Sequence, residues 1–455
     1  MFRSINPATG QELATYREDD SAEVERKLVK AVAAFQTWRR SSFADRQSLL
    51  QKIADNFEAN KQRLAEMATL EMGKTLPAAV VEIEKCATAF RYYSVHGAEH
   101  LQSKSITLAN NRTAETIWLP LGPILAIMPW NLPFFQVARF IAPFVMAGNV
   151  GLLKHAPNVQ GCAALLEEMI MTAGAPDGLF QNLRIEPLAI AELIADDRVA
   201  SVTITGSERA GKAVAEQAGR HLKKVVLELG GSDPFIVMPS ADLNEVIPQA
   251  VRARIQNNGQ SCICGKRMIV HSDIYDEFLK QFVAAMGAVR VGDPMDATTE
   301  LGPLSSEGQL NLILGQIDEA KQIGASLLVG GEKREGKGAF LTAGVLVDVP
   351  LNSPFMKEEI FGPVAMVFKA ANIDEAIQIA NDVPYGLGSS VWTNDKAEQS
   401  RFAQEIEAGM TAFNQILMST PEAPFGGIKH SGHGRELGSL GLYEFMNAKT
   451  LIHSA

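Results

Sequence analysis

The sequence contains few cysteines and no long apolar run. Only four cysteines occur among 455 residues, which excludes a framework of disulfide bonds and favours a reducing compartment, so we expect a cytoplasmic protein. No apolar stretch reaches the roughly 18 residues that a membrane-spanning helix needs. The first residues, MFRSINPATGQELATY, lack the apolar core of a secretion signal. We therefore expect no membrane partner.

The chain also lacks an excess of basic residues. It has 42 Lys and Arg against 52 Asp and Glu, a formal net charge of -10, which disfavours nucleic acid and anionic surfaces as partners. Apolar residues make up 46% and charged residues 21%, an ordinary globular composition. A chain of this length exceeds what one hydrophobic core accommodates, so two or three domains are expected.

Helical and strand-like patterns alternate along most of the chain. Residues 20–38 form an amphipathic pattern that Asp20 can cap, and 106–128 is strand-like with a hairpin turn expected at Asn110-Asn111. Apolar strands are expected at 148–156, 200–207, 223–231 and 325–331, and helices at 158–174, 208–221, 273–288, 307–323, 373–381 and 396–406. Strands separated by helices predict α/β domains with doubly wound parallel sheets, here two in series.

Two of the cysteines lie close together in NNGQSCICGKR at 257–267. Zinc requires about four ligands, whereas Cys86 and Cys162 are distant and no histidines cluster nearby, so we expect no metal site. Two interpretations of Cys262 and Cys264 remain open on the residues alone. They are buried small side chains, or one is a nucleophile, since the neighbouring glycines let other groups approach closely.

Three further stretches carry polar groups suited to chemistry. Glu228 lies inside an apolar strand, where burial would raise its pKa and suit a general base, unless it is a strand-end residue that meets solvent. Gly206-Ser207 lies between a strand and a helix whose N-terminus can bind phosphate, although such caps are common. Asn131, in IMPWNLPF, offers an amide donor suited to an oxyanion hole, unless the stretch is only a proline-rich turn.

Taken in order, five stretches resemble the NAD(P)-dependent aldehyde dehydrogenase superfamily. They are PWN at 129–131, LELGG at 227–231, GQSC at 259–262, EEIFGPV at 358–364 and PFGGIKHSGHGRE at 424–436. The similarity begins with INPATG at 5–10 and covers the whole chain.

The resemblance implies an aldehyde dehydrogenase-like α/β fold in three parts. These are a Rossmann-type dinucleotide-binding domain (1–107 and 127–228), an α/β catalytic domain (229–420) and a small β oligomerisation element (108–126 and 437–455). An isolated hairpin is marginally stable, so a partner subunit should complete that element, and we expect a homodimer or homotetramer.

The resemblance also implies roles for three catalytic residues. Cys262 would attack the aldehyde as a thiolate and form a thiohemiacetal and then a thioester. The Asn131 side chain and the Cys262 N–H would hold the oxyanion. Glu228 would activate the water that hydrolyses the thioester, which favours a hydrolytic enzyme over one that forms acyl-CoA.

Cofactor contacts follow from the same resemblance. Lys154 would bind the adenosine ribose, Glu359 the nicotinamide ribose, and Phe361 would lie near the nicotinamide. The full set is Trp130, Asn131, Lys154, His155, Ala156, Pro157, Gly206, Ser207, Leu229, Glu359 and Phe361.

The position three residues after Lys154 bears on the choice of cofactor. Members strict for NAD often place a glutamate there, but this chain has Pro157, so no carboxylate repels a 2′-phosphate. Lys154 and His155 could offer positive charge, although His155 could equally be a plain surface residue. The cofactor is therefore NADP or NAD, with NADP favoured.

Arg139 is the main indication of the substrate. It lies amid apolar neighbours, where an arginine needs an anionic partner, and succinate-semialdehyde dehydrogenases use an arginine at this place to bind the substrate carboxylate. Ser419, beside Thr420, and Phe425 would complete the substrate site. The resemblance thus predicts oxidation of succinate semialdehyde, or a similar ω-carboxy aldehyde, to the acid.

Three alternatives stay open. Arg139 could form a structural ion pair, and the protein would then be a broad-specificity aliphatic aldehyde dehydrogenase. Gln256 stands where some relatives have a second arginine, so the substrate range could be broader. A cofactor-binding redox sensor without turnover is a further possibility, although Cys262, Glu228 and Asn131 are all intact. Cys264 could form a disulfide with Cys262 as a reversible oxidative switch, or be a small filler.

Overall fold

The structure, a computed structural model, describes residues 1–454. The helices are α1 (Ser21–Trp38), α2 (Phe43–Ala59), α3 (Lys61–Met72), α4 (Leu76–His100), α5 (Phe135–Ala147), α6 (Gln160–Thr172), α7 (Pro187–Ala195), α8 (Glu208–Arg220), α9 (Leu243–Ile255), α10 (Tyr275–Gly287), α11 (Glu307–Gln322), α12 (Ile373–Asn381), α13 (Lys396–Glu405) and α14 (Gly438–Tyr443). Short 3-10 turns are η1 (Ala109–Asn111), η2 (Pro157–Val159), η3 (Gln256–Gly259) and η4 (Pro354–Lys357).

The strands fall into five sheets within these residues. They are β1 (Phe2–Ile5), β2 (Glu12–Tyr16), β3 (Lys104–Thr107), β4 (Thr113–Pro120), β5 (Pro123–Ile127), β6 (Val150–Lys154), β7 (Phe180–Asn182), β8 (Ser201–Thr205), β9 (Lys224–Glu228), β10 (Pro234–Val237), β11 (Arg267–His271), β12 (Ser326–Val329), β13 (Gly344–Val347), β14 (Val364–Ala370), β15 (Tyr385–Gly386), β16 (Gly388–Trp392), β17 (Met410–Phe413), β18 (Ile428–Lys429), β19 (Gly432–His433) and β20 (Met446–His453).

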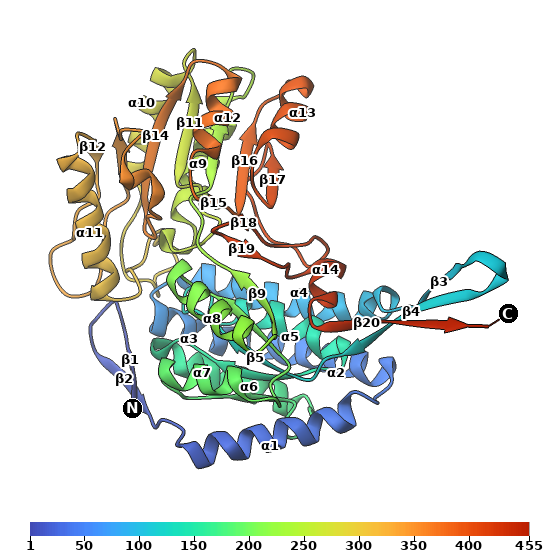
Figure 1. The fold of residues 1–455 in the computed structure, drawn as a ribbon. Helices are drawn as coiled ribbons and strands as arrows, with labels where there is room; N and C mark the ends of the chain where they lie inside the picture. Colours follow the sequence, from blue (N-terminus) through green and yellow to red (C-terminus); the bar gives the residue numbers. More distant parts are fainter. Residues whose placement is uncertain (455) are drawn as a thin grey trace.

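A six-stranded sheet in the lower part of Figure 1 has the order β19-β9-β8-β5-β6-β7. Its last five strands are parallel, with Leu125 of β5 beside Leu152 of β6 and Val202 of β8. When these five strands are numbered by their order in the sequence, their order across the sheet is 5-4-1-2-3, which is the doubly wound arrangement of dinucleotide-binding folds. Every residue of β5, β6 and β8 is buried, as expected for a parallel sheet that helices cover on both faces.

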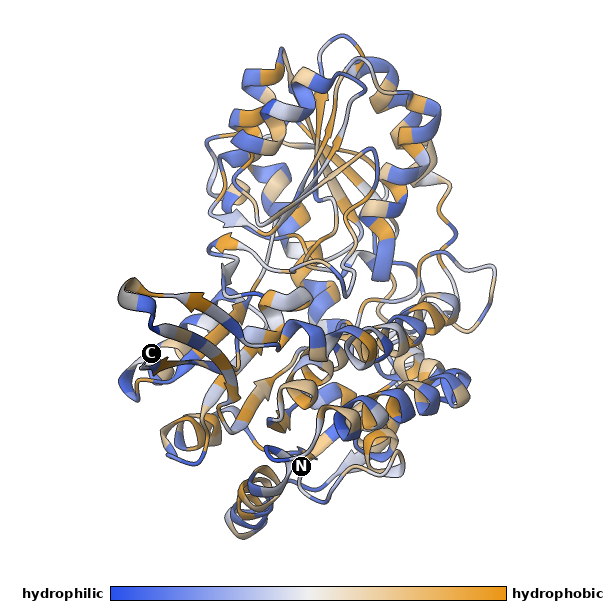
Figure 2. Ribbon diagram, turned by 90° about the vertical axis from the view of Figure 1, so that its right-hand side faces the viewer, coloured by the Kyte–Doolittle hydropathy of each residue, from blue (hydrophilic) through white to orange (hydrophobic). Residues whose placement is uncertain are grey.

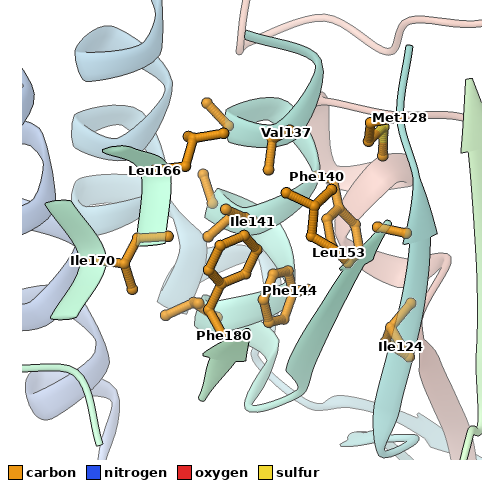
Figure 3. Packing of buried hydrophobic residues seen from close by; sticks show 14 of the residues in the cluster. Ile124, Met128, Val137, Phe140, Ile141, Phe144, Leu153, Leu166, Ile170 and Phe180 are labelled. Atoms are coloured by element: carbon orange, nitrogen blue, oxygen red, sulfur yellow. The ribbon is translucent and has the colours of Figure 1, made fainter. Parts of the chain in front are cut away.

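Helix α5 packs its apolar surface against this sheet. All thirteen of its residues are buried, and the rings of Phe140 and Phe144 stack with centroids 4.5 Å apart. Figure 3 shows these side chains beside Leu153 of β6 and Phe180 of β7. Because a close-packed core resists displacement, the polar residues that α5 carries are held in fixed positions.

A seven-stranded sheet occupies the upper part of Figure 1, in the order β12-β13-β14-β11-β10-β16-β17. Only the β12–β13 pair is antiparallel. In Figure 2 the apolar residues gather along these strands, and the surrounding helices carry hydrophilic residues as well. The two expected α/β units in series are thus present as two separate sheets.

The third large sheet is an arm of three strands, β20-β4-β3, that extends away from the rest of the molecule (Figure 1). Strands β3 and β4 form a hairpin whose turn contains η1, where the sequence predicted it. Strand β20 pairs with β4 along its whole length, from Met446 beside Pro120 to His453 beside Thr113.

Sheet membership corrects the ends of the predicted domain segments. Strand β3 belongs to the arm although 104–107 was assigned to the dinucleotide-binding domain, and β5 is a central strand of the six-stranded sheet although 123–126 was assigned to the arm. The strand pattern could not separate β4 from β5, because both are strand-like and only two residues divide them. The remaining division into domains stays a prediction.

The expected helices occur within two residues of their predicted ends. Helix α1 begins at Ser21, and the Asp20 carboxylate accepts a hydrogen bond of 2.9 Å from the Glu23 N–H. Among residues 1–454, no helix combines the length and the apolar character needed to cross a membrane.

Candidate active site

The predicted cofactor and oxyanion residues meet at the point where the strand order of the six-stranded sheet reverses. Strand β5 leads into the loop that carries Trp130 and Asn131, and its neighbour β8 leads into Gly206 and Ser207. Chain segments leave these two strands in opposite directions, which opens a crevice at their carboxyl ends. Ligands of doubly wound sheets bind in this crevice.

The segment before Cys262 is a sharp left-handed turn. Asn257, Asn258 and Gly259 have φ values of 52°, 57° and 73°, a region that asparagine and glycine tolerate better than other residues. A side chain at Gly259 would clash with the backbone of Gly362. The Asn258 amide donates to the carbonyls of Gly73 and Pro303, each at 2.8 Å. The turn is therefore fixed on both sides.

Sequence reasoning did not single out Asn257 and Asn258. The signal was present, because consecutive asparagines before a glycine are typical of positive φ. Arg254 is fully buried and donates to the carbonyls of Gly259, Ile360 and Gly362. It joins the turn to the EEIFGPV segment.

Cys262 is partly exposed to a cavity, and Lys266 supports its main chain. The Lys266 ammonium donates to the carbonyls of Cys262 at 2.7 Å and Ser261 at 3.0 Å. Burial raises the pKa of the Cys262 thiol to about 12, while the cations of Arg139 and Lys266 act in the opposite direction. The thiolate therefore needs these two cations, because burial alone disfavours it.

Asn131 is held against the Cys262 turn by two amide hydrogen bonds. Its Nδ2 donates to the Gln260 carbonyl at 3.0 Å, and Asn257 Nδ2 donates to the Asn131 carbonyl at 2.8 Å. An amide nitrogen carries two hydrogens, so one donor of Asn131 remains for another acceptor. The arrangement suits stabilisation of an oxyanion near Cys262.

Glu228 lies at the end of β9 with 2% of its surface exposed. Neither carboxylate oxygen has a hydrogen-bond partner among residues 1–454. Burial raises the pKa of this carboxyl well above its usual range, the nearby Glu436 raises it further, and Arg139 opposes both. A Cβ at Gly426 would lie 2.5 Å from Glu228 Oε1, so glycine is required there.

Arg139 forms the structural ion pair that the sequence left open as the alternative. Its guanidinium pairs with Glu436, and both side chains are 2% exposed. Nη2 donates to Thr205 Oγ1 at 3.3 Å, and the guanidinium lies 4.4 Å from the centroid of the Phe425 ring. The expectation of an arginine that needs a substrate carboxylate as its counterion is therefore wrong, because Glu436 supplies one. The sequence did not reveal this ion pair, because Glu436 lies far along the chain from Arg139.

A cavity of about 450 Å³ brings the predicted substrate residues to Cys262. Lys85 also faces it, which the sequence analysis missed because Lys85 lies in a helical pattern with no motif. Thr420 lies outside it, in a neighbouring hollow. The lining residues that matter to the chemistry are Lys85, Arg139, Gln256, Cys262, Ser419 and Phe425.

A second hollow, of about 580 Å³, lies on the predicted cofactor side and is lined by Ser207, Gly230 and Glu359 among others. A Cβ at Gly230 would clash with Glu359 Oε2. The Glu359 carboxylate can therefore lie against residue 230 only because that residue is glycine. Glu359 Oε1 accepts from Lys266 at 2.9 Å and from the Gly231 N–H at 3.2 Å. Glu359 thus lies between this hollow, which includes the N-terminus of α8, and Lys266, which bonds the Cys262 carbonyl.

Aromatic and aliphatic side chains border the same region. The rings of Trp130 and Phe361 meet edge to face, with centroids 5.7 Å apart. Leu229 is buried against Gly211 of α8, where any side chain in place of the glycine would meet it. The predicted contacts therefore come from both large sheets.

Residues 154–157 follow β6. His155 is 1% exposed, with Nε2 2.8 Å from the Pro133 carbonyl, to which it donates, while Nδ1 accepts from the Ala156 N–H at 2.9 Å. Burial lowers the pKa of His155 to about 4. Both sequence interpretations of this side chain, a surface residue or a positive charge, are therefore wrong. Lys154 is largely buried, which lowers its pKa, and Pro157 is exposed.

Cys264 is fully buried, and its thiol donates to the Gln256 carbonyl at 3.5 Å. Both Cys262 and Cys264 are free thiols. The predicted disulfide between them stays a prediction. Among residues 1–454, no three His, Cys, Asp or Glu side chains gather as they would around a metal ion.

The sequence and the fold match a known enzyme family. A family profile described as "Aldehyde dehydrogenase family" matches residues 1–451. The chain belongs to the aldehyde dehydrogenase family.

Named relatives are similar over nearly the full length. The chain is 48% identical over 450 residues to succinate-semialdehyde dehydrogenase (NADP+) 1 of Mycobacterium bovis, covering 98% of both chains. It is 49% identical over 452 residues to the succinate-semialdehyde dehydrogenase (NADP+) of Mycobacterium avium, covering 98% of this chain and 96% of the other. The succinic semialdehyde dehydrogenase of Streptococcus pyogenes, solved in complex with NADP+, superposes with a TM-score of 0.97 at 36% identity over 99% of both chains.

Proposed function

We propose that this protein oxidises succinate semialdehyde, or a similar ω-carboxy aldehyde, to the carboxylic acid with NADP. The observation that carries the proposal is the cavity that Cys262 shares with Lys85, a cation that no carboxylate among residues 1–454 neutralises. A negatively charged aldehyde gains from such an environment and an uncharged one does not. Relatives at 48% and 49% identity are named for this substrate and cofactor.

The reaction begins at Cys262. Its thiolate adds to the aldehyde carbon, and the free N–H of Asn131 Nδ2 and the Cys262 main-chain N–H stabilise the oxyanion. When bound, the nicotinamide supplies the acceptor for the hydride that leaves the thiohemiacetal carbon. Asn131 keeps the thioester carbonyl polarised between the two steps.

Glu228 then acts as the general base. A raised pKa brings a carboxylate closer to neutral pH and strengthens it as a base. It takes a proton from a water molecule that attacks the thioester carbon, and the Cys262 thiolate leaves. The unbonded carboxylate oxygens of Glu228 are available to orient that water.

The residues around the second hollow fit a dinucleotide. The N–H groups at the start of α8, after Ser207, suit a pyrophosphate, and Glu359 would accept from the nicotinamide ribose. Lys154, at the end of β6, would bind the adenosine ribose or the 2′-phosphate. With Pro157 in place of an acidic residue, no carboxylate at that position opposes the extra phosphate of NADP.

The arm supports a homo-oligomer. Ile106 of β3 is 62% exposed and Ile452 of β20 is 64% exposed, and β20 is an edge strand whose main-chain groups can pair with another chain. A second copy would cover both. We also propose a cytoplasmic location, as predicted from the sequence.

The test compares kcat/KM for succinate semialdehyde and butanal, each with NADP and with NAD. We expect the charged aldehyde with NADP to be preferred by at least about tenfold over butanal, since a hydrogen bond to a charged group contributes about 1.5–3 kcal/mol. Equal values for the two aldehydes would instead assign a broad-specificity aliphatic aldehyde dehydrogenase. Absence of turnover with every aldehyde would favour the redox sensor.

A further inference from the structure

We propose that Lys85, together with Ser419, binds the distal carboxylate of the substrate and so determines its specificity. The inference rests on the proposed function and names the residue that selects the charged aldehyde. It assigns to α4 a part of the substrate site that no motif in the sequence indicates.

The position of Lys85 carries the proposal. It faces the same cavity as Cys262, and its ammonium donates to Ser419 Oγ at 2.7 Å. The ammonium also lies 4.4 Å from the centroid of the Phe135 ring. The contacts with the ring and the hydroxyl fix the ammonium and leave two of its three donors for a ligand.

Lys85 differs from Lys266, Arg139 and Lys74 in having no counterion. Lys266 pairs with Glu359, Arg139 with Glu436, and Lys74 with Glu82. Among residues 1–454, no carboxylate lies within 4.0 Å of the Lys85 ammonium. A half-buried ammonium without an anion is unfavourable, so a bound carboxylate would supply the missing charge.

The charges around Lys85 favour an anion in the cavity. Burial and the nearby Arg139 cation lower the pKa of Lys85 to about 8, while Glu82, Cys86 and Cys262 oppose this change. Lys85 and Arg139 face one cavity and repel each other. A substrate carboxylate bound between these cations and the Ser419 hydroxyl relieves the repulsion. Arg139, already neutralised by Glu436, contributes less to this binding than Lys85.

The first experiment compares wild type with Lys85→Met and Lys85→Arg, using succinate semialdehyde and butanal. Methionine keeps the apolar contact with Phe135 and removes the charge. We expect Lys85→Met to lose about 10- to 100-fold in kcat/KM for succinate semialdehyde, mainly through KM, with butanal changed less than about threefold. Lys85→Arg should recover part of the preference.

A pH series separates binding from an effect on the nucleophile. The wild-type ratio of kcat/KM for the charged aldehyde over butanal should fall as the pH rises above about 8 and Lys85 loses its proton, and should level off at the ratio found for Lys85→Met. Ionisation of Cys262 affects both substrates and cancels in the ratio. In Lys85→Met the ratio should not change in this range.

Arg252 provides the matched control, since it also lies at the cavity but is exposed. Arg252→Gln should keep the wild-type preference, because an exposed charge is screened by solvent. If Lys85→Met keeps the preference and Arg252→Gln loses it, Lys85 is not the binding group. If Lys85→Met lowers kcat/KM equally for both aldehydes, Lys85 serves catalysis instead, and the proposal fails. If wild type itself shows no preference, the proposed function fails first.

Discussion

Glu228 and His155 are buried and Cys262 is partly buried, and burial shifts the pKa of each so that the neutral form is favoured. The consequence differs with the chemistry of each side chain. The raised pKa of Glu228 strengthens this carboxylate as a base. The raised pKa of Cys262 must be opposed by nearby cations if the thiolate is to form. The lowered pKa of His155 keeps its ring neutral, and this ring holds a loop. Each therefore predicts a different experimental outcome.

Glu228→Gln should separate the two halves of the reaction. Because glutamine cannot accept the proton of water, we expect a burst of NADPH close to one equivalent per site, followed by steady-state turnover reduced about 10²- to 10⁴-fold. Rapid mixing followed at the NADPH absorbance would measure both. Cys262→Ala is the control and should abolish the burst as well. A burst lost equally in Glu228→Gln would show that Glu228 acts before thioester formation.

His155 predicts a loss of stability in acid. Its pKa is about 4 in the folded protein against about 6.5 unfolded, so below pH 6.5 the unfolded chain binds a proton that the folded chain does not. The free energy of unfolding therefore falls as the pH drops from about 6.5 to 4, by up to about 3 kcal/mol. Urea unfolding at pH 7 and pH 5 would measure it.

The control for this prediction is a histidine that is exposed. His155→Gln should reduce the difference in unfolding free energy between pH 7 and pH 5, whereas His221→Gln, at the exposed end of α8, should leave it unchanged. An identical pH dependence in all three proteins would rule out His155 as the source.

At the scale of elements, the left-handed turn after α9 connects parts of the molecule that are distant in sequence. Besides its two donated bonds, Asn258 accepts a hydrogen bond of 3.0 Å from the Gly302 N–H through Oδ1. One side chain thus fixes the turn to the segments around Gly73 and Gly302. The position of Cys262, four residues later, depends on it.

Asn258→Ala should therefore lower both stability and activity. Three buried main-chain groups would lose their partner, at about 1–3 kcal/mol each if unrelieved, and alanine tolerates the positive φ poorly. We expect unfolding free energy to fall by at least about 2 kcal/mol and kcat to fall about tenfold or more. Asn258→Gly is the matched variant, since it keeps the backbone conformation and loses the same bonds. If the glycine variant is as stable as wild type, the hydrogen bonds contribute nothing.

Much of these elements could be predicted from local pattern. The helix at 20–38, the hairpin turn near Asn111 and the presence of strands β8 and β9, though not their ends, need only capping, periodicity and turn chemistry. The separation of β4 from β5 could not be predicted, because it depends on which sheet each strand joins.

The features of the active site likewise divide into those that sequence motifs predict and those that only the tertiary fold creates. The positions of Cys262, Asn131 and Glu228 followed from motifs, whereas the pairing of Arg139 with Glu436 and of Lys85 with Ser419 joins residues that only the tertiary fold brings together. The neutral state of His155 is likewise a property of burial. Sequence alone shows neither which charges meet nor how deeply each is covered.

At the scale of the whole molecule, the arm predicts self-association. Replacing Ile106 and Ile452 together by lysine would place two charges on the exposed faces of β3 and β20, and burying these charges against another copy would be costly. We expect the double variant to show a smaller mass in light scattering than wild type. Val29→Lys, on the exposed side of α1, is the control. An unchanged mass in the double variant would exclude the arm as the interface.

The short strand β19 gives the molecule a particular order of assembly. Gly432 pairs with Glu228 itself, and Glu436, which lies beside that base, follows four residues later. During synthesis these residues leave the ribosome after all the other strands of both large sheets. The base and its electrostatic surroundings can therefore form only when translation is nearly complete, so a chain that ends before β19 should show no aldehyde turnover.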